Sequence, residues 1–359
     1  MNDEFSRLIR AAVLAPSGDN TQPWDILYRA EAEAIEIFLD PERDPSTINA
    51  GQRMSLIACG AALENVCTLA GALGWSTMVE MQAPDRWDRR ILIARVRPGV
   101  QKAPENALAV ERILRERVTN RHVYQFRSLP AELRSHLEQA LPAVPGLQVH
   151  WITAPDQQEM LANLIARGDA SMFREPSMRQ AFLHNIRFDL PPDAPADEGL
   201  SLGSLEIAYA DQLALRAMRY MPDLLFRILR GAQMLGAHTR KLVRSSSGLC
   251  LVAVKEGEPY PEIQVGRVAQ RAWLALTQAG LAAQPMMSLV GLHFGMTCGT
   301  AQLVESLRRL HAPKLLQDFR HFLAGIGVSG TPGFILRFGY APPPTCRVGR
   351  RSPPPDARP

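Results

Sequence analysis

Polar side chains are concentrated in a bend close to the start of the chain. The segment APSGDNTQPW, Ala15–Trp24, holds a hydroxyl and two carboxamides at Ser17, Asn20 and Gln22. Proline, glycine and asparagine are typical turn residues, but a turn does not require closely spaced carboxamides with an indole behind them. The composition favours a backbone that presents polar groups to a flat ligand.

A second polar segment, RVTNR, has the residue types of an anion clamp. Two arginines, Arg117 and Arg121, bracket Thr119 just before an extended stretch. Guanidinium groups pair with phosphate oxygens through two parallel hydrogen bonds, and the threonine hydroxyl adds a neutral donor. The alternative for this segment taken alone is a solvated turn with surface ion pairs.

Two further segments add an apolar wall and more positive charge. In GLAAQPMM, Pro285 favours an extended geometry at Gln284, so that the N–H groups of Met286 and Met287 can point into a cleft. The alternative is an ordinary helix exit with core methionines. The proline-rich end of the chain carries arginines that belong either to a ligand site or to a disordered basic tail, namely Arg347, Arg350 and Arg351.

Together the four segments favour one kind of ligand. A polar bend, a phosphate-type clamp, an apolar rim and a second set of arginines suit a molecule with an aromatic ring system at one end and a phosphate at the other. A competing motif, GIGVSG at Gly325–Gly330, has the glycine spacing of a dinucleotide fingerprint. It lies between a helical segment and a strand, which reverses the required order, so we expect a flexible turn there.

Composition limits the class of protein. The 359 residues are 46% apolar and 21% charged, with a net charge of +4 and no long basic run. These values are typical of a soluble globular protein with a small anionic ligand rather than nucleic acid. The five widely spaced cysteines favour buried free thiols, and no zinc spacing occurs. The start of the chain has no signal core and no uninterrupted 18-residue apolar run follows, so we expect a cytoplasmic location.

Hydrophobic periodicity predicts helices and strands that alternate in two similar rounds, a hint of internal duplication without a strict sequence repeat. We expect helices at about 5–13, 55–75, 261–280 and 315–324, further helices beginning near 105, 130 and 156, and strands at 35–40, 91–98, 147–153, 249–254 and 334–338.

Two segments stand apart from this pattern. The stretch Ile186–Ser204 combines prolines, glycines and acids without periodicity, which favours a lid, a binding loop or a disordered excursion. The stretch Leu213–Arg244 mixes methionine, leucine and arginine in an amphipathic helix or helix pair. In the simpler interpretation its apolar side meets the core, and in the alternative it lies on a membrane surface.

These motifs resemble a known family. APSGDNTQPW closely resembles the A-P-S-x-x-N-x-Q-P-W signature of the nitroreductase family of FMN-dependent oxidoreductases. RVTNR resembles the family's Arg-x-Ser-x-Arg/Lys phosphate segment, with Thr119 in the serine place. QAGLAAQPMM resembles the segment that lines the flavin, and RFGYAPPPTCRVGRR resembles the closing strand and basic motif. The motif order is similar to that of the fused Acg-like branch, in which one chain mimics the family's homodimer.

The resemblance implies an α+β fold with an α/β-like element order and a central, mainly antiparallel sheet flanked by helices. Two fused halves, 1–104 and 105–340, would form a pseudo-dimer, with a lid at 186–204 and a C-terminal arm at 341–359. One FMN site per chain would be built from both halves. The cofactor-binding residues that the resemblance implies are Ser17, Asn20, Gln22, Arg117, Thr119, Arg121, Gln284, Pro285, Met286, Arg350 and Arg351.

The resemblance also implies a reaction. Electrons from NAD(P)H would pass through the flavin to a small-molecule acceptor such as a nitroaromatic or a quinone, so no side chain is expected to act as a catalytic acid or base. We expect no nucleic-acid or membrane partner, no metal, and a monomer or homodimer. The acidic lid leaves a second interpretation, a flavin-sequestering protein with little or no NAD(P)H turnover.

Overall fold

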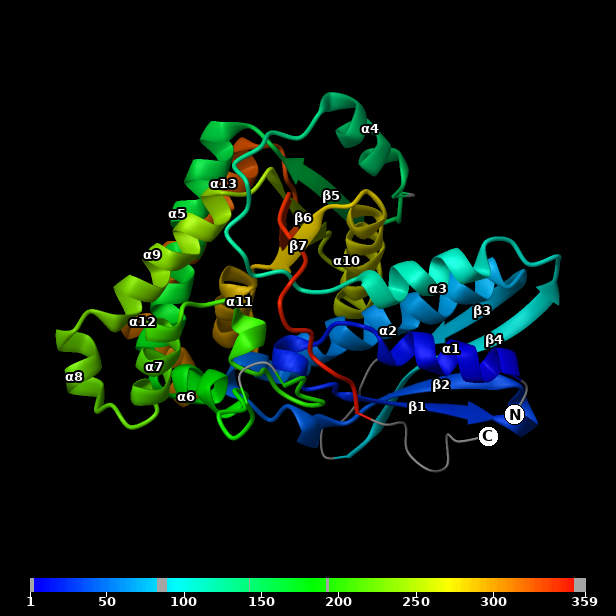
Figure 1. Cartoon of the computed structure of the whole chain (residues 1–359), viewed down its shortest axis with the longest axis horizontal. Helices are drawn as coiled ribbons and strands as arrows, with labels where there is room; N and C mark the ends of the chain where they lie inside the picture. The colour runs from blue at the N-terminus through cyan, green and yellow to red at the C-terminus, as the bar shows by residue number, and fades with distance from the viewer. Residues whose placement is uncertain (1–2, 83–88, 142, 192–193, 352–359) are drawn as a thin grey trace.

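Two four-stranded antiparallel sheets, each covered by helices, organise the chain (Figure 1). The computed structural model describes residues 3–82, 89–141, 143–191 and 194–351, so residues 192–193 of the predicted lid and 352–359 of the predicted arm lie outside the described residues. The expected α+β class and antiparallel pairing are confirmed. Each half carries its own sheet instead of sharing one central sheet.

The first sheet has the strand order β1-β2-β4-β3. Alternate residues of β2, Ile35, Ile37 and Leu39, are fully buried in the core that α1 and α2 share with the sheet. In chain order the elements are α1 (Asp3–Val13), β1 (Trp24–Arg29), β2 (Ala34–Leu39), α2 (Arg53–Ala72), β3 (Trp75–Met81), β4 (Ile91–Gln101) and α3 (Ala107–Glu116).

The second sheet repeats this order as β5-β6-β8-β7, again first, second, fourth, third. The repeated order supports the internal duplication that the sequence only hints at. The second round differs by helices inserted before β6 and before β8. Its elements are α4 (Ala131–Gln139), β5 (Leu147–Ile152), α5 (Pro155–Arg174), α6 (Pro176–His184), α7 (Tyr209–Met218), α8 (Asp223–Ile228), α9 (Gly231–Arg244), β6 (Gly248–Val254), α10 (Pro261–Gln278), β7 (Ala282–Pro285), α11 (Ser288–Cys298), α12 (Ala301–Arg309), α13 (Ala312–Gly325) and β8 (Thr331–Gly339).

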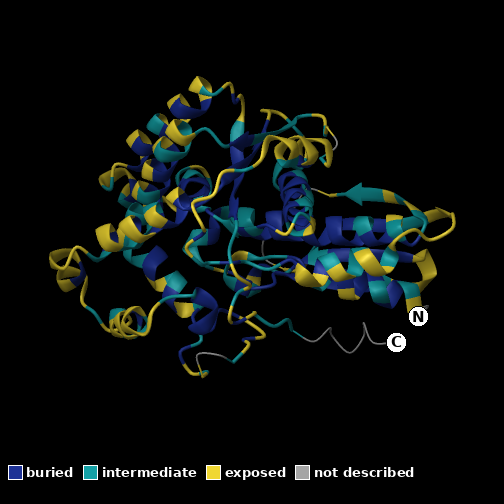
Figure 2. Cartoon of the chain, turned by 45° about the horizontal axis from the view of Figure 1, so that its top comes forward, coloured by how far each residue is buried: buried dark blue, intermediate teal, exposed yellow. Residues whose placement is uncertain are grey.

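The two halves meet along α2 and α10, the long helices that follow the second strand of each sheet. Their backbones approach so closely that only glycine fits at the crossing. A Cβ added to Gly60 would collide with the carbonyl oxygen of Ile263, and a Cβ added to Gly266 would collide with that of Ile57. This contact is reciprocal, as in the interface of a two-fold dimer. Both helices are mostly buried (Figure 2).

Most predicted elements are present with shifted ends. All seven residues of β6 are buried, as expected for a strand covered on both faces. The predicted helix 55–75 ends earlier, because Gly74 takes a φ of +86° and the chain turns into β3. The strands β1, β3 and β7 were not predicted. β7 has four residues, and β1 and β3 show no clear alternation of apolar and polar residues. GIGVSG forms the turn between α13 and β8, as predicted.

Two apolar or amphipathic helical segments differ in how far they are buried. Thr47–Ala72 is long and apolar enough to span a membrane by length and composition, but 78% of its most apolar window is buried inside the protein, which identifies it as a core helix. The segment predicted as one amphipathic helix or a pair, Leu213–Arg244, lies in the three helices α7, α8 and α9. The expectation that its apolar side meets the core holds for Leu215 and Met218 of α7, which pack in a hydrophobic cluster. It is wrong for α8, where Leu224, Leu225 and Ile228 are exposed.

Candidate functional site

The polar bend has an unusual backbone. Asp19, Asn20 and Gln22 have positive φ angles of 45°, 59° and 50°. Such angles are uncommon outside glycine and are concentrated at functional sites. The Gln22 N–H donates to Oγ of Ser17 at 3.0 Å, which closes the bend just before β1. The sequence therefore holds two carboxamides in a fixed and locally strained orientation.

Those carboxamides contact the lid and the C-terminal arm. Nδ2 of Asn20 lies 3.3–3.4 Å from carbonyl oxygens of the lid and arm, and Nε2 of Gln22 donates to the Asp197 carbonyl at 2.6 Å. The side-chain oxygens are used as well. The Arg351 N–H donates to Oε1 of Gln22 at 2.9 Å, and Nη1 of Arg350 donates to Oδ1 of Asn20 at 3.1 Å. In this arrangement the lid and arm cover the bend.

Arg350 ties the arm to the end of α1. Its Nε donates to the Val13 carbonyl at 2.9 Å, and its Nη2 lies 3.3 Å and 3.1 Å from the carbonyls of Leu14 and Ala15. Arg351 pairs with Glu198 of the lid, with Nε 3.1 Å from Oε2. The two neighbouring arginines therefore differ, because Arg351 has a carboxylate partner, whereas among the described residues the oxygens that Arg350 bonds to are neutral.

Arg117 is a buried cation at the end of α3. Its residue is 6% exposed, its guanidinium carbon lies 4.6 Å from the ring centroid of Trp273, and Nη2 donates to the Leu14 carbonyl at 3.0 Å. Nε is buried and has no hydrogen-bond partner among the described residues. Burial first, and then the charges of Arg350 and Arg347, lower the pKa of Arg117 to about 9. Three arginines thus converge here, and we name Arg117, Arg347 and Arg350 the arginine cluster.

Arg121 faces a different environment. Its Nη1 donates to the Ser204 carbonyl at the end of the lid at 2.9 Å. Burial lowers its pKa, while the carboxylates of Asp19 and Glu206 act in the opposite direction. The predicted pair Arg117 and Arg121 is therefore split. Arg117 joins the arginine cluster, whereas Arg121 lies between the bend and the lid.

The segment RVTNR runs beside the predicted flavin-lining segment. Thr119 forms an isolated bridge with Ala283 of β7, and the Asn120 N–H donates to the Ala283 carbonyl at 2.9 Å. One expected detail is wrong. The Met286 N–H donates to the Ile335 carbonyl at 2.8 Å inside the sheet and does not point into a cleft. Gln284 has the extended geometry that Pro285 predicts, since both residues belong to β7 and pair with Arg337 and Leu336 of β8.

Arg337, which the sequence analysis missed, organises the wall behind this segment. It is fully buried on β8, its Nε donates to Oε1 of Gln284 at 2.7 Å, and its Nη2 donates to the His122 carbonyl at 2.7 Å. Its guanidinium carbon lies 3.8 Å from the ring centroid of Tyr124. A lone arginine inside the apolar strand FILRF was the available signal.

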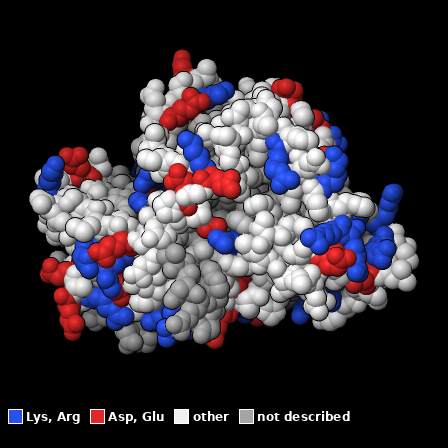
Figure 3. Space-filling view, turned by 180° about the vertical axis from the view of Figure 1, so that it is seen from behind, with Lys and Arg blue, Asp and Glu red and all other residues white. Residues whose placement is uncertain are grey.

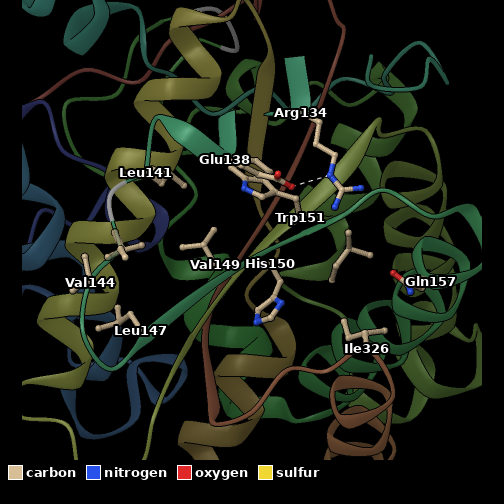
Figure 4. Close-up of a pocket in the computed structure, with 13 residues that line it drawn as sticks. Arg134, Glu138, Leu141, Val144, Leu147, Val149, His150, Trp151, Gln157 and Ile326 are labelled. Carbon is tan, nitrogen blue, oxygen red and sulfur yellow. Dashed lines mark hydrogen bonds and ion pairs between the residues drawn. The ribbon is translucent and has the colours of Figure 1, made fainter. Parts of the chain in front are cut away.

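All four predicted segments therefore meet at the junction of the halves. Two cavities are described, and neither is lined by the bend, by RVTNR or by the arm. One, of about 520 Å³, is bounded by α4, β5 and Val268 (Figure 4), and the other, of about 280 Å³, is bounded partly by Arg53 and Cys298. Within the described residues no group of three or more His, Cys, Asp or Glu side chains has a metal-binding arrangement.

Sequence comparison identifies relatives with nitroreductase names. No protein-family model matches this chain. An uncharacterized protein of Mycobacterium tuberculosis is 28% identical over 354 residues, which is 95% of this chain and 46% of the relative. A protein of M. tuberculosis named as an NAD(P)H nitroreductase is 28% identical over 155 residues, 43% of each chain. PigM of a Serratia species, also named as an NAD(P)H nitroreductase, is 32% identical over 79 residues, 21% of this chain and 22% of PigM.

The matched segments thus cover less than half the length of each of these relatives. Two solved structures are also similar. A Bacteroides fragilis nitroreductase with bound FMN matches 64% of this chain and 87% of its own, with 12% identity and a TM-score of 0.35. The FMN-dependent nitroreductase NfnB of Mycobacterium smegmatis, in complex with NADPH, matches 69% and 96%, with 19% identity and a TM-score of 0.36.

Proposed function

We propose that this chain is an oxidoreductase of the nitroreductase type that binds FMN and accepts electrons from NAD(P)H. The names of its sequence relatives and the convergence of the four motif segments support this assignment. The single observation that carries it is the arginine cluster. A buried cation with an orphaned Nε, and with two further cations as its charged neighbours, fits a site that receives an anion.

The residues present fit a flavin mononucleotide best at its phosphate end. Arg117, Arg350 and Arg347 would hold the phosphate, with the hydroxyl of Thr119 as a nearby neutral donor. Arg351 contributes less, because Glu198 already neutralises it. At the ring end, β7 and the buried Arg337 supply a rigid wall at Gln284 and Pro285. The bend would add Ser17, Asn20 and Gln22 once its carboxamides are released from the lid.

The domain organisation belongs to the same proposal. We infer a fused pseudo-dimer with halves at 1–104 and 105–340, supported by the repeated strand order and the reciprocal glycine contact. One site per chain follows, since the bend comes from the first half and RVTNR from the second. We expect a cytoplasmic protein that is a monomer or homodimer.

When bound, FMN supplies the hydride and electron chemistry, and the chain's own residues bind, orient and shield it. Arg121 would lie toward the ring end, between the bend and the lid, with its charge partly offset by Asp19 and Glu206. No described side chain is needed to move a proton at carbon, so the acceptor is open to nitroaromatics and quinones of the size that the lid admits.

A second function is favoured by one specific observation. Lid and arm carbonyls accept hydrogen bonds from the carboxamides of Asn20 and Gln22, and Gly349 donates to the Ala196 carbonyl at 2.9 Å. A lid held this firmly suits a protein that sequesters flavin and turns over little NAD(P)H. The same contacts also suit a closed state that opens for catalysis, so turnover decides between the two functions.

The test begins with the visible spectrum of the protein after incubation with FMN and gel filtration. Retained absorbance near the flavin bands supports binding, and a colourless protein overturns the proposal. Adding NADPH without oxygen then separates the two functions, since bleaching identifies an oxidoreductase and persistent colour a sequestering protein. The variant Glu198→Gln, which frees Arg351 from the lid, should accelerate bleaching if the closed lid limits access.

A further inference from the structure

An exposed apolar surface lies on the helices that follow the lid in the chain. Within the described part of the chain, fourteen large apolar residues are exposed, and eight of them lie between residues 209 and 234. Scattered exposed apolar residues need no explanation, but this concentration does. We name it the α7–α9 apolar surface; its members are Tyr209, Leu213, Tyr220, Leu224, Leu225, Ile228, Leu229 and Met234.

Helix α8 is held in place from its other side. Phe226 is buried, the guanidinium carbon of Arg179 lies 4.5 Å from the centroid of its ring, and Arg179 pairs with Asp223. The apolar residues at 224, 225, 228 and 229 follow one helical face, and Leu224 and Ile228 are 67% and 66% exposed. The fold thus fixes this helix with its apolar face outward, so the exposure is a built feature and not a frayed end.

Positive charge surrounds these side chains. From residue 209 to residue 234 the chain has four arginines and two aspartates, a local charge of +2. One aspartate, Asp223, is already paired with Arg179. Arg219 is exposed and stacks near Phe188 and Tyr220, and no ion pair is described for Arg227 or Arg230. Exposed leucine and isoleucine side chains therefore alternate with Arg227 and Arg230. Arg219 lies close enough to Asp189 to add to Arg187 in lowering the pKa of that carboxyl.

The surface also protrudes. Helices α7 and α8 lie at the end of the molecule opposite the first sheet (Figure 1), and seen from behind, this end of the molecule carries both basic and acidic side chains (Figure 3). A protruding apolar surface with a basic surround suits a flat, negatively charged partner better than a ligand that needs a cavity.

We propose that the α7–α9 apolar surface docks the protein on a membrane rich in anionic lipids. Leucine, isoleucine and methionine side chains enter the headgroup boundary, Tyr209 and Tyr220 lie at the interface, and the arginines pair with lipid phosphates. A second copy of this chain fits less well. Two such surfaces would bring Arg219, Arg227 and Arg230 of each copy together, with Asp211 and Asp189 as the nearby acids.

The experiment is sedimentation of the full chain with vesicles of phosphatidylglycerol and phosphatidylcholine in equal amounts, compared with phosphatidylcholine alone. We expect pelleting with the anionic vesicles, and weaker pelleting in about 0.5 M salt because the Debye length shortens. The double variant Arg227→Gln/Arg230→Gln should lower the partition coefficient about thirtyfold, because each arginine near an anionic membrane contributes about 1 kcal/mol of binding free energy. The variant Leu224→Glu/Ile228→Glu should abolish pelleting.

The matched control is Leu108→Glu, since Leu108 is an isolated exposed leucine on α3. It should pellet like the unmodified protein, and all variants should keep the same circular dichroism. No pelleting of the unmodified protein, equal pelleting with neutral vesicles, or unchanged pelleting of Leu224→Glu/Ile228→Glu would overturn the proposal. A dimer in solution that Leu224→Glu/Ile228→Glu dissociates would also overturn it, in favour of self-association.

Discussion

Two clusters of buried charge lie at the junction of the halves, and they are balanced in opposite ways. Glu64 on α2 is 3% exposed and receives two arginines of α10, with Nε of Arg267 3.0 Å from its Oε2 and Arg271 forked on both oxygens. In the arginine cluster, Arg117 is almost as buried but its charged neighbours are cations. The first cluster contains charges of both signs, whereas no carboxylate partner is described for Arg117 in the second.

The difference is between a buried charge that is paired inside the chain and one for which no opposite charge is described. A buried charge is tolerated when a partner offsets its loss of hydration, and removing that partner is costly. The Glu64 group meets this condition and holds α2 against α10, next to the hydrogen bond of 2.7 Å from Gln270 to Asn65. The arginine cluster does not meet it. We predict that an anion supplies the counter-charge that the described residues do not give this second cluster.

The first prediction breaks the balanced cluster and has the largest expected effect. Glu64→Gln leaves Arg267 and Arg271 without their carboxylate at the helix crossing. We expect the free energy of unfolding to fall by about 3 kcal/mol, the lower end for a broken buried pair, because both guanidinium groups keep some access to water. Urea unfolding followed by circular dichroism measures the change.

Glu305→Gln is the matched control for this variant. Glu305 pairs with Arg309 one turn away on the exposed face of α12, with Nε 3.2 Å from Oε1. Removing an exposed pair of this kind should change stability by less than about 0.5 kcal/mol. Equal losses in the free energy of unfolding for Glu64→Gln and Glu305→Gln would show that the Glu64 group does not stabilise the contact between α2 and α10.

The fold could be predicted from the sequence where the pattern was long and regular. The buried run of β6, the helix α10 after Pro261, and the turn at GIGVSG follow from local periodicity and turn chemistry. The split into two sheets did not follow, since β1, β3 and β7 have no clear sequence pattern and their pairing is set by tertiary contacts. The outward face of α8 was also missed, because an amphipathic pattern does not say which neighbour covers it.

The site could be predicted as a set of segments but not as a set of contacts. Residue types at Asn20, Arg117 and Thr119 marked segments that do meet in space. That Arg121 lies toward the lid and that the Met286 N–H serves the sheet depends on packing between distant segments, which no local spacing encodes. The roles of these residues toward FMN stay predictions.

The second prediction completes the unbalanced cluster with an external anion. FMN at a hundred times its dissociation constant should raise the free energy of unfolding by about 2.7 kcal/mol, since it binds the folded chain alone. In Arg117→Met the same FMN concentration should give less than half of that gain. Without FMN this variant should change stability by less than about 1 kcal/mol, because losing the Leu14 hydrogen bond is offset by removing an unpaired buried cation.

Inorganic phosphate sharpens this second prediction. It should stabilise the unmodified chain at millimolar concentration but not Arg117→Met, which would assign the effect to the anion and not to the flavin ring. Stabilisation by FMN that is unchanged in Arg117→Met would contradict the assignment of the arginine cluster to the phosphate.

The last prediction concerns Asp44, a buried carboxyl that is intermediate between the two clusters because it has hydrogen-bond donors but no described ion pair. It accepts hydrogen bonds from Ser46 and Thr21 but no arginine offsets it, and burial, with a contribution from Asp19, raises its pKa to about 6. The folded chain therefore binds more protons than the unfolded chain between about pH 4 and pH 6, and stability from this group falls as the pH rises through that window. The loss should be about 2 kcal/mol.

Asp44→Asn removes this titration, so the difference in stability between the unmodified chain and the variant should shift in favour of the variant from pH 4 to pH 7. Asp189→Asn is the control, because Arg187 lowers the pKa of the exposed Asp189 to about 2 and its titration ends below this range. Urea unfolding at pH 4, 5, 6 and 7 gives both curves. If the curve for Asp44→Asn runs parallel to that of the unmodified chain, hydrogen bonds alone suffice to balance a buried charge here, and the case for an external anion at Arg117 weakens accordingly.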